Sequence, residues 1–448
     1  MSELVERVLA LSRADGCVVV LRESRGADLR WAGNTLTTNG ARAQRSLAVV
    51  SVVGDSVGAT SASSVDDLES LVRASEQAAR DAGPAEDAGP LVEGRASADF
   101  AEPAEAASPR VFDAFARELG EAFGGARADG IRLYGYASHD VTTTWLGSSS
   151  GLRLRHAEPT GYVELTGKGD APGASTWVGQ HTRDWTDVAV PALDADVRRR
   201  LAWAQRQVDL PAGRYETLLP PSAVADLLVY AYWTAAGRDA AEGRTVFSRP
   251  GGGTRVGDRI GPAGLRMRSD PAYSGAPFAV TTASSSVTSV FDNGLPLTAT
   301  DWLSDGVLTA LVQTRATATA AGVPVTPYVH NLDVDGGGTA TLDEMVAGTT
   351  GRGLLLTSLW YIREVDAPTL LLTGLTRDGV YLVEDGEVVG AVNNFRFNES
   401  PVDLLGRVTE VGRTQECLPR ELSDYFTWTR MPSLRVPDFN MSSVSQAF

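Results

Sequence analysis

The chain has 448 residues, 43% of them hydrophobic, which is enough apolar sequence to build two cores of ordinary size. Its 40 Lys and Arg residues are outnumbered by 56 Asp and Glu, giving a formal net charge of −16. A nucleic-acid-binding protein needs a basic face to neutralise phosphates, so this balance disfavours nucleic acid as a partner. No segment reaches the roughly 18 uninterrupted apolar residues of a membrane span, so no membrane partner is expected.

The first residues, MSELVERVLALSRADGC, predict an amphipathic helix that begins with Ser2 as its cap and ends before Gly16. Acidic residues occupy the place where a signal peptide would have basic ones, so we expect a cytoplasmic protein. The two cysteines, Cys17 and Cys417, are too few for a disulfide framework and agree with a reducing compartment.

The segment up to residue 83 alternates between helical and strand patterns. Apolar and β-branched runs such as CVVVL and SLAVVSVVG predict strands, and SVDDLESLVRASEQAARDAG predicts an amphipathic helix that ends near Gly83. Helix, strands and helix in this order indicate an antiparallel or mixed sheet with helices on one face.

The next segment, residues 83–108, is dense in Ala, Pro, Gly and acidic residues and has no sustained period, which indicates an acidic Ala/Pro linker or surface loop. Residues 110–126 predict a second helix, residues 131–169 a run of hairpin strands, and residues 197–213 a basic helix with Pro211 at its exit. We place a domain boundary there, giving an N-terminal α/β domain over 1–210 and a β-rich C-terminal domain over 211–448.

The second half begins with the strand RYETLLP and the helical segment DLLVYAYWTAAGRD, and then contains many short strands with Gly turns. Within it, VYLVEDGEVVGAV carries the Asp-Gly signal of a tight hairpin. The whole chain is therefore predicted to be an α+β protein.

Three motifs match sequence patterns of functional sites, but each has a simpler structural interpretation. Residues 54–58 match the G-x-S-x-G pattern of a serine hydrolase, yet no helix follows the serine at once, which favours a hairpin turn. Residues 331–342 resemble a calcium loop, but Leu342 stands where a bidentate carboxylate is needed, which favours a solvated glycine turn. The segment RPGGGTRVG, around Gly251, lacks a complete nucleotide-binding pattern and is expected to be a loop.

The histidines argue against a local zinc site. They are His139, His156, His181 and His330, and no two stand three or four residues apart, the spacing that places two imidazoles on one helical face. A metal site assembled from distant histidines stays open, and His139 with Asp140 is expected to be a polar pair at a strand end.

Several segments together resemble the TldD/PmbA family of metallopeptidases. They are FDNGLPLTATDWLSDGVLTALVQTRATATAAG at 291–322, GRGLLLTSLWYI at 351–362, DGVYLVEDGEVVGAVNNFRF at 378–397, PSLRVPDFNMSS at 432–443 and, more weakly, residues 30–72. The resemblance covers most of the chain, in order, and implies the fold of that family.

The resemblance also implies an assembly of two related subunits. The TldD type carries a His-Glu-x-x-x-His helix, whose two histidines bind zinc and whose glutamate is the general base. The TldE or PmbA type has the same fold without that motif. Together they enclose a chamber that admits unfolded peptides or precursor peptides.

Alignment on GRTVFS places the family's metal helix over DLLVYAYWTAAGRD. The expected ligand positions then hold Leu228 and Trp233, and the base position holds Val229, so none of the three can bind zinc or take a proton. Cys417 lies close to where catalytic subunits supply a cysteine ligand, but a core or loop cysteine is the simpler reading. No catalytic or metal-binding residue and no cofactor are therefore expected in this chain, and zinc is expected in the partner.

The resulting hypothesis is a non-catalytic subunit that completes the chamber and stabilises a TldD-type partner as a heterodimer. Tyr230, Tyr232, Trp360 and Tyr361 are candidate contacts to peptide or partner, with core packing as the alternative for each. Two other hypotheses stay open. One is a zinc-independent hydrolase or small-molecule enzyme that reuses the fold as a homo-oligomer, with a site around His139, Asp140 or His330. The other is a pure peptide-binding protein.

Overall fold

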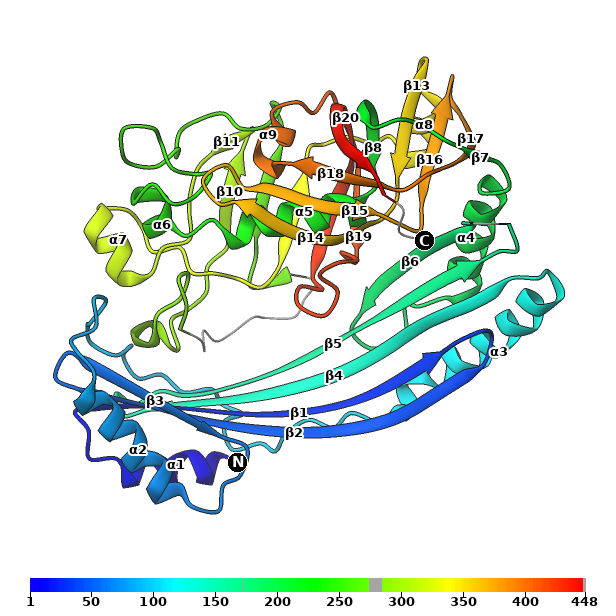
Figure 1. The fold of residues 1–448 in the computed structure, drawn as a ribbon. Helices are drawn as coiled ribbons and strands as arrows, with labels where there is room; N and C mark the ends of the chain where they lie inside the picture. The colour runs from blue at the N-terminus through cyan, green and yellow to red at the C-terminus, as the bar shows by residue number, and fades with distance from the viewer. Residues whose placement is uncertain (172, 274–283, 446–448) are drawn as a thin grey trace.

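The computed structural model describes residues 1–171, 173–273 and 284–445. Its secondary structure divides between two sheets that follow one another along the chain (Figure 1). The first is six-stranded, antiparallel and ordered β3-β2-β1-β4-β5-β6. Its strands are β1 (Gly16–Trp31), β2 (Leu36–Val53), β3 (Ser56–Ala62), β4 (Arg132–Ser148), β5 (Arg153–Lys168) and β6 (Ser175–Thr182).

Helices cover one face of this sheet, as the order of the elements predicts. They are α1 (Ser2–Leu11), α2 (Leu68–Asp81), η1 (Pro109–Phe112), α3 (Asp113–Ala128) and α4 (Val190–Trp203). The two glycines Gly147 and Gly167 let helices approach closely, because a Cβ there would lie 2.4 Å from Val5 of α1 and 2.3 Å from Val197 of α4. The opposite face of the sheet is turned toward the second half of the chain (Figure 1).

Two local predictions for this domain are corrected. Ser2 lies inside α1, Met1 is the N-cap residue, and no side chain caps the helix. The segment 131–169 forms two strands of 17 and 16 residues, where the sequence predicted several hairpin strands. Because β1 and β5 are each 16 residues long and flank β4 on its two sides, together they supply backbone partners along the whole of β4 and keep it extended.

The second sheet has 14 strands among the described residues, with both parallel and antiparallel pairs. Its central strand is β20, which pairs with β8, β12, β18 and β19. Its strands are β7 (Gln207–Val208), β8 (Gly213–Leu219), β9 (Arg266–Ser269), β10 (Thr300–Ser304), β11 (Val307–Leu308), β12 (Leu332–Asp335), β13 (Arg352–Leu356), β14 (Leu359–Asp366), β15 (Leu371–Thr376), β16 (Val380–Glu384), β17 (Glu387–Val392), β18 (Phe395–Glu399), β19 (Glu410–Cys417) and β20 (Thr429–Val444).

Short helices accompany this sheet, and α5 lies in its main core. They are α5 (Pro221–Trp233), α6 (Gly237–Ala241), η3 (Val290–Asp292), α7 (Arg315–Ala321), α8 (Leu342–Ala347) and α9 (Pro401–Leu405). The fold is thus α+β with a β-rich C-terminal half, as predicted. Within the described ranges, no helix has the length and apolar character needed to span a membrane.

The two halves share part of their core. One apolar cluster combines Phe115 and Trp185, beneath the first sheet, with Leu355 and Tyr381 of the second. Polar contacts add to it, since the hydroxyl of Tyr162 on β5 donates to Asp424 in the loop between β19 and β20. The halves therefore pack as one continuous structure.

The acidic segment 83–108 has little regular structure and links α2 to α3 within the N-terminal half, yet it contacts both halves. Leu91 packs beside β1 residues in an apolar cluster. Arg95 donates to the Gly294 carbonyl oxygen at 3.2 Å, and Asp87 accepts a hydrogen bond of 2.6 Å from the Ser289 hydroxyl. The segment is a strap across the junction of the two halves.

The G-x-S-x-G match and the calcium-like segment both form turns, as their simpler interpretations predict. The G-x-S-x-G match forms the turn between β2 and β3, with Gly54 at a positive φ of 57°. The calcium-like segment is β12 followed by a glycine turn, in which the Gly337 amide donates to Asp335 at 3.0 Å.

Candidate functional site

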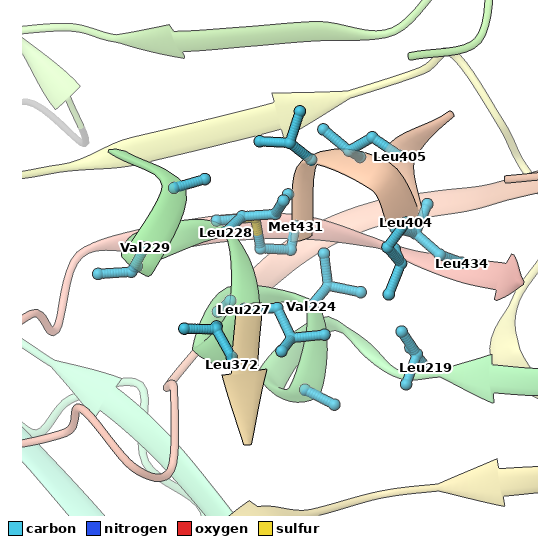
Figure 2. Close-up of a cluster of buried hydrophobic side chains, with 14 of the residues drawn as sticks. Leu219, Val224, Leu227, Leu228, Val229, Leu372, Leu404, Leu405, Met431 and Leu434 are labelled. Atoms are coloured by element: carbon cyan, nitrogen blue, oxygen red, sulfur yellow. The ribbon is translucent and has the colours of Figure 1, made fainter. Parts of the chain in front are cut away.

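Helix α5 occupies the position where the sequence resemblance places a metal-binding helix. Pro221 stands in its first turn, where a missing N–H costs no hydrogen bond, and most of the residues that follow are apolar, on more than one face of the helix. Such a helix must be buried over most of its circumference. Accordingly, β20 runs against α5 and α9 packs beside it (Figure 2).

The residues at the expected ligand and base positions of the metal helix, Leu228, Trp233 and Val229, provide no site for zinc. Leu228 is 1% exposed and Val229 is 0% exposed, and both belong to the main apolar core. Trp233 is half-buried, and its indole N–H donates to the Tyr328 hydroxyl at 3.2 Å. Aliphatic side chains have no donor atom for a metal, and an indole N–H is a hydrogen-bond donor only.

Two buried polar groups near α5 do not replace the missing ligands. Asp226 of α5 is fully buried, and burial raises the pKa of its carboxyl well above the usual range, although one oxygen accepts from the Glu421 amide at 2.9 Å. Burial also raises the pKa of the Cys417 thiol to about 12, and its sulfur lies 3.3 Å from the Thr429 hydroxyl. The Cys417 thiol is therefore protonated at neutral pH and the raised pKa of Asp226 favours its protonated form, whereas zinc needs thiolate or carboxylate ligands.

The chain around α5 thus does not fit the zinc ion of the catalytic subunits. Across residues 1–171, 173–273 and 284–445, no group of three or more His, Cys, Asp or Glu side chains is arranged to hold a metal ion. Catalytic zinc takes three protein ligands as a rule, and the side chains at the aligned positions of α5 supply none of them.

The four histidines are dispersed over the structure. His139 is buried, and the backbone oxygen of Cys417 lies 3.2 Å from His181 Nδ1. His330 Nε2 lies 2.7 Å from the Tyr425 carbonyl oxygen. Burial lowers the pKa of His139 and His156. Backbone oxygens thus contact His181 and His330, whereas His139 Nδ1 and His156 Nε2 are buried and have no hydrogen-bond partner within the described residues.

The prediction that His139 and Asp140 form a pair at a strand end is wrong. Both lie in the middle of β4, and successive residues of a strand point to opposite faces. His139 is buried, and Asp140 instead binds Arg42 on β2, which also binds Asp28. The long pairing of β4 with its neighbours decides this separation, because it keeps the strand regular through both residues.

The four candidate contact residues have different environments. Trp360 and Tyr361 are 36% and 54% exposed and lie side by side on β14. The half-buried Tyr230 contacts the same strand, since its hydroxyl donates to the Ile362 carbonyl oxygen at 3.0 Å. Tyr232 is completely buried and bonded to Val329, so it packs in the core, the alternative noted for it.

Sequence reasoning missed the residue that organises this surface. The Glu421 carboxylate accepts hydrogen bonds from the amides of Tyr361 and Ile362, at 2.8 and 3.0 Å, and from Arg363 at 3.0 Å. The amide of Glu421 is in turn held by Asp226, so the surface is connected to α5. No local sequence pattern indicates this link, because the residues lie far apart in the chain.

Comparisons with known proteins agree with the resemblance. The crystal structure of TldE from Thermococcus kodakarensis is 17% identical, with a TM-score of 0.79 over 98% of this chain and 99% of that one. Two proposed modulators of DNA gyrase also match. The protein from Thermotoga maritima is 16% identical, with a TM-score of 0.77 over 98% of this chain and 99% of that one. The protein from Bacteroides thetaiotaomicron is 14% identical, with a TM-score of 0.74 over 99% of this chain and 98% of that one.

At these identities the solved structures establish the fold alone. Among curated proteins, none matches this sequence. The PmbA/TldA metallopeptidase C-terminal domain, however, matches residues 212–443, which is more than half of the chain and includes α5 and almost all of the second sheet. The chain therefore belongs to the TldD/PmbA family of metallopeptidases.

Proposed function

We propose that this chain is a non-catalytic subunit of a heterodimeric zinc metallopeptidase that cleaves unfolded peptides or trims precursor peptides. Zinc is supplied by a TldD-type partner, and this chain completes the chamber and stabilises that partner. The proposal places the complex in the cytoplasm.

The observation that supports the proposal most strongly is the apolar packing of α5. Leu228 and Val229 stand at the positions expected for a ligand and the general base, and both side chains are fully enclosed by the apolar core (Figure 2). Creating a zinc site there would require polar groups to enter a packed interior, which is costly without partners. Family membership combined with this packing favours a subunit that acts through a partner.

A surface for that partner is available on β14. In the described part of the chain β14 pairs only with β15, so it is an edge strand, and edge strands readily accept another chain. Trp360 and Tyr361 are exposed on it, and the exposed guanidinium of Arg363 lies 4.4 Å from the Tyr361 ring, whereas Arg420, 5.0 Å from the Trp360 ring, is buried. Exposed Trp, Tyr and Arg are the residue types that dominate binding energy at protein interfaces.

The test is co-expression with a TldD-type protein from the same genome, followed by size-exclusion chromatography, zinc quantification and cleavage of an unfolded peptide. We expect zinc and chelator-sensitive cleavage in the co-eluting complex, and neither with this chain alone. Chelator-resistant cleavage by the chain alone would support the zinc-independent hydrolase instead. Peptide binding without any complex would support the pure binding protein.

A double variant, Trp360→Ala with Tyr361→Ala, tests the surface. Removing two interface aromatics weakens affinity for the partner by about tenfold or more, because each such anchor contributes on the order of 1 kcal/mol or more. Leu36→Ala is the matched control, since Leu36 is also exposed but begins β2 in the other half. Equal affinity of both variants for the partner would remove β14 from the interface.

A further inference from the structure

A cavity of about 700 Å³ lies between α6 and α7, at one end of the second sheet. The glycine-rich loop at Gly253 forms one wall, and Glu86 and Asp87 of the acidic strap form another. In Figure 1, α6 and α7 lie together at the side of the C-terminal half. Small-molecule sites commonly have this volume and lie where two parts of a protein meet.

Small side chains keep the cavity open. Ala316 and Ala320 are four residues apart on α7 and so share the face that lines it. Ala241 of α6 faces it across the gap, and Leu311 lies in the floor. The lining is therefore mainly apolar, and it suits a ligand with an apolar body.

One polar side chain in the floor is unsatisfied. Gln313 lines the cavity and is only 8% exposed, and its Oε1 atom has no hydrogen-bond partner within the described ranges. Buried amides normally have partners, so such a group is a place where a ligand gains from binding. A side-chain amide presents both a donor and an acceptor, and its natural complement is another amide.

The position of Gln313 depends on Gly237, the first residue of α6. A Cβ atom on Gly237 would lie 2.0 Å from Gln313 Nε2 and 2.7 Å from Oε1. Any other residue there would displace the amide. The absence of a side chain thus makes room for a polar group at the base of an otherwise apolar cavity.

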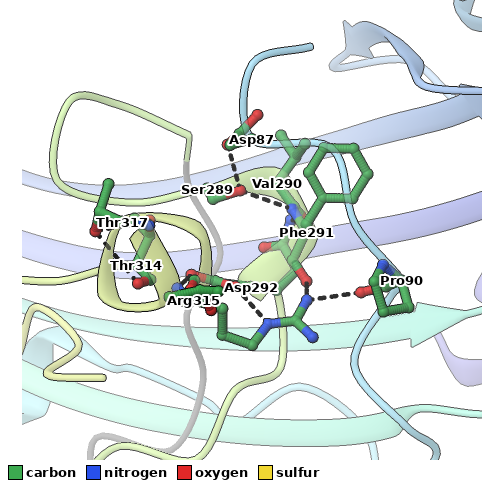
Figure 3. Close-up of polar contacts among 11 residues, drawn as sticks. Asp87, Pro90, Ser289, Val290, Phe291, Asp292, Thr314, Arg315 and Thr317 are labelled. Atoms are coloured by element: carbon green, nitrogen blue, oxygen red, sulfur yellow. Dashed lines mark hydrogen bonds and ion pairs between the residues drawn. The ribbon is translucent and has the colours of Figure 1, made fainter. Parts of the chain in front are cut away.

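The rim is acidic. Glu86, Asp87 and Glu242 line it together with Arg238, the one cation among the lining residues, which pairs with Glu86 and, at 2.9 Å, with Glu242. Glu242 also pairs at 2.6 Å with Arg244, which lies outside the lining. Asp87 is fixed by its hydrogen bond from Ser289, as Figure 3 shows. The lining residues therefore carry a formal net charge of −2, which favours a positively charged group at the opening.

We propose that this cavity binds an apolar ligand that carries an amide and a protonated amine, the chemistry of the amino-terminal residues of a short peptide. The amide pairs with Gln313, the apolar body packs on α7, and the amine faces the acidic rim. The inference goes beyond the proposed subunit function and does not depend on it, because it requires neither a partner chain nor β14.

The test is isothermal titration calorimetry of the full chain with leucyl-leucinamide, which has all three features. We expect saturable binding, and at least tenfold weaker binding of the N-acetylated probe, which lacks the positive charge. Ala320→Phe fills the cavity from its exposed side and should weaken binding at least tenfold. Thr319→Phe, one residue along the same helix and outside the lining, should leave it within twofold.

Gln313→Leu removes the amide at the base of the cavity and should also weaken binding of the probe at least tenfold. If this variant misfolds, the pair Ala320→Phe and Thr319→Phe still decides the matter, since both changes are at exposed positions. The proposal is overturned if the wild-type chain shows no saturable binding at millimolar probe. It is also overturned if the two α7 variants bind alike, or if acetylation has no effect.

Discussion

Two neighbouring parts of the C-terminal half, α5 and the cavity between α6 and α7, differ in how their space is filled. Helix α5 presents Leu, Val and Tyr side chains that fill the core completely. The cavity begins only four residues after α5 ends, and its helices present Ala and Gly. The volume of the side chains, and not the presence of helices, decides where this chain has room for another molecule.

The buried polar groups of the two regions differ in the same way. Asp226 on α5 has one carboxyl oxygen without a partner within the described residues, but it is enclosed in the core. Gln313 has one unpartnered oxygen beside an open cavity. A ligand can therefore satisfy Gln313, whereas no ligand reaches Asp226, and its raised pKa favours the neutral form, which avoids a buried charge.

The largest expected effect comes from restoring an acidic residue to α5. Val229→Glu places a carboxyl group without partners at a position that is 0% exposed, so we expect a loss of roughly 5 kcal/mol or more in the free energy of unfolding. Urea denaturation measures it, and Val365→Glu at a 59% exposed position should change stability by less than about 0.5 kcal/mol. Full tolerance of Val229→Glu would mean that the helix is less closed than its packing indicates.

A smaller effect is expected where the acidic strap is held beside the cavity. Arg315 pairs with the buried Asp292 at 2.7 Å and donates to the Pro90 carbonyl oxygen at 2.7 Å (Figure 3). Arg315→Met leaves that carboxylate without its cation. Because Arg315 is partly exposed and its own amide still binds Asp292, we expect a loss of about 2 kcal/mol.

Proteolysis adds a local readout for the same change. The strap should be cleaved faster near residue 90 in Arg315→Met, as mass spectrometry of limited digests would show. Arg259→Met is the control, since its ion pair with Asp305 is exposed on both sides and contributes little to stability. Similar stability and digestion of the two variants would show that the strap is held by other contacts.

The smallest expected effect is a pH dependence at Asp226. Burial raises the pKa of its carboxyl in the folded state, so above the ordinary value of 3.8 the unfolded chain releases a proton that the folded chain keeps. This group's contribution to stability therefore decreases as pH rises, until the folded-state pKa is reached. Asp226→Asn keeps an acceptor for the Glu421 amide and removes the titration.

We expect Asp226→Asn to gain stability relative to the wild type as pH increases from 5 to 6, by at most about 1.4 kcal/mol over that one pH unit. Thermal denaturation across that range measures it. The exposed Asp67 is the control, because its hydrogen bonds with Ser70 lower the pKa of its carboxyl and Asp67→Asn should not produce this gain. A constant difference between Asp226→Asn and the wild type would show that Asp226 is ionised in the folded chain.

Much of the fold could be predicted from local patterns. The helix over Leu68–Asp81 and the turns at Gly54 and Gly337 follow from apolar spacing and turn residues, which act within a few positions of the chain. The apolar character of α5 was equally evident, because Leu228 and Val229 are chemically unable to act whatever surrounds them.

Features that depend on distant residues could not be predicted in this way. The length of β4 depends on its pairing with β1 and β5, and with it the separation of His139 from Asp140 onto opposite faces. Tyr232 and Trp360 look alike in sequence, yet packing buries the first completely and leaves the second partly exposed. Burial depends on which elements cover a residue, and that information is not local.

The sequence by itself determined the family, the α+β class and the absence of donor atoms at Leu228 and Val229, because these rest on residue identity and order. Only the tertiary structure decided that Glu421 links β14 to Asp226, that the acidic strap joins the two halves, and that a cavity opens over Gln313. The physical reason is that hydrogen bonding, close packing and empty space arise between residues that the fold brings together from distant parts of the chain.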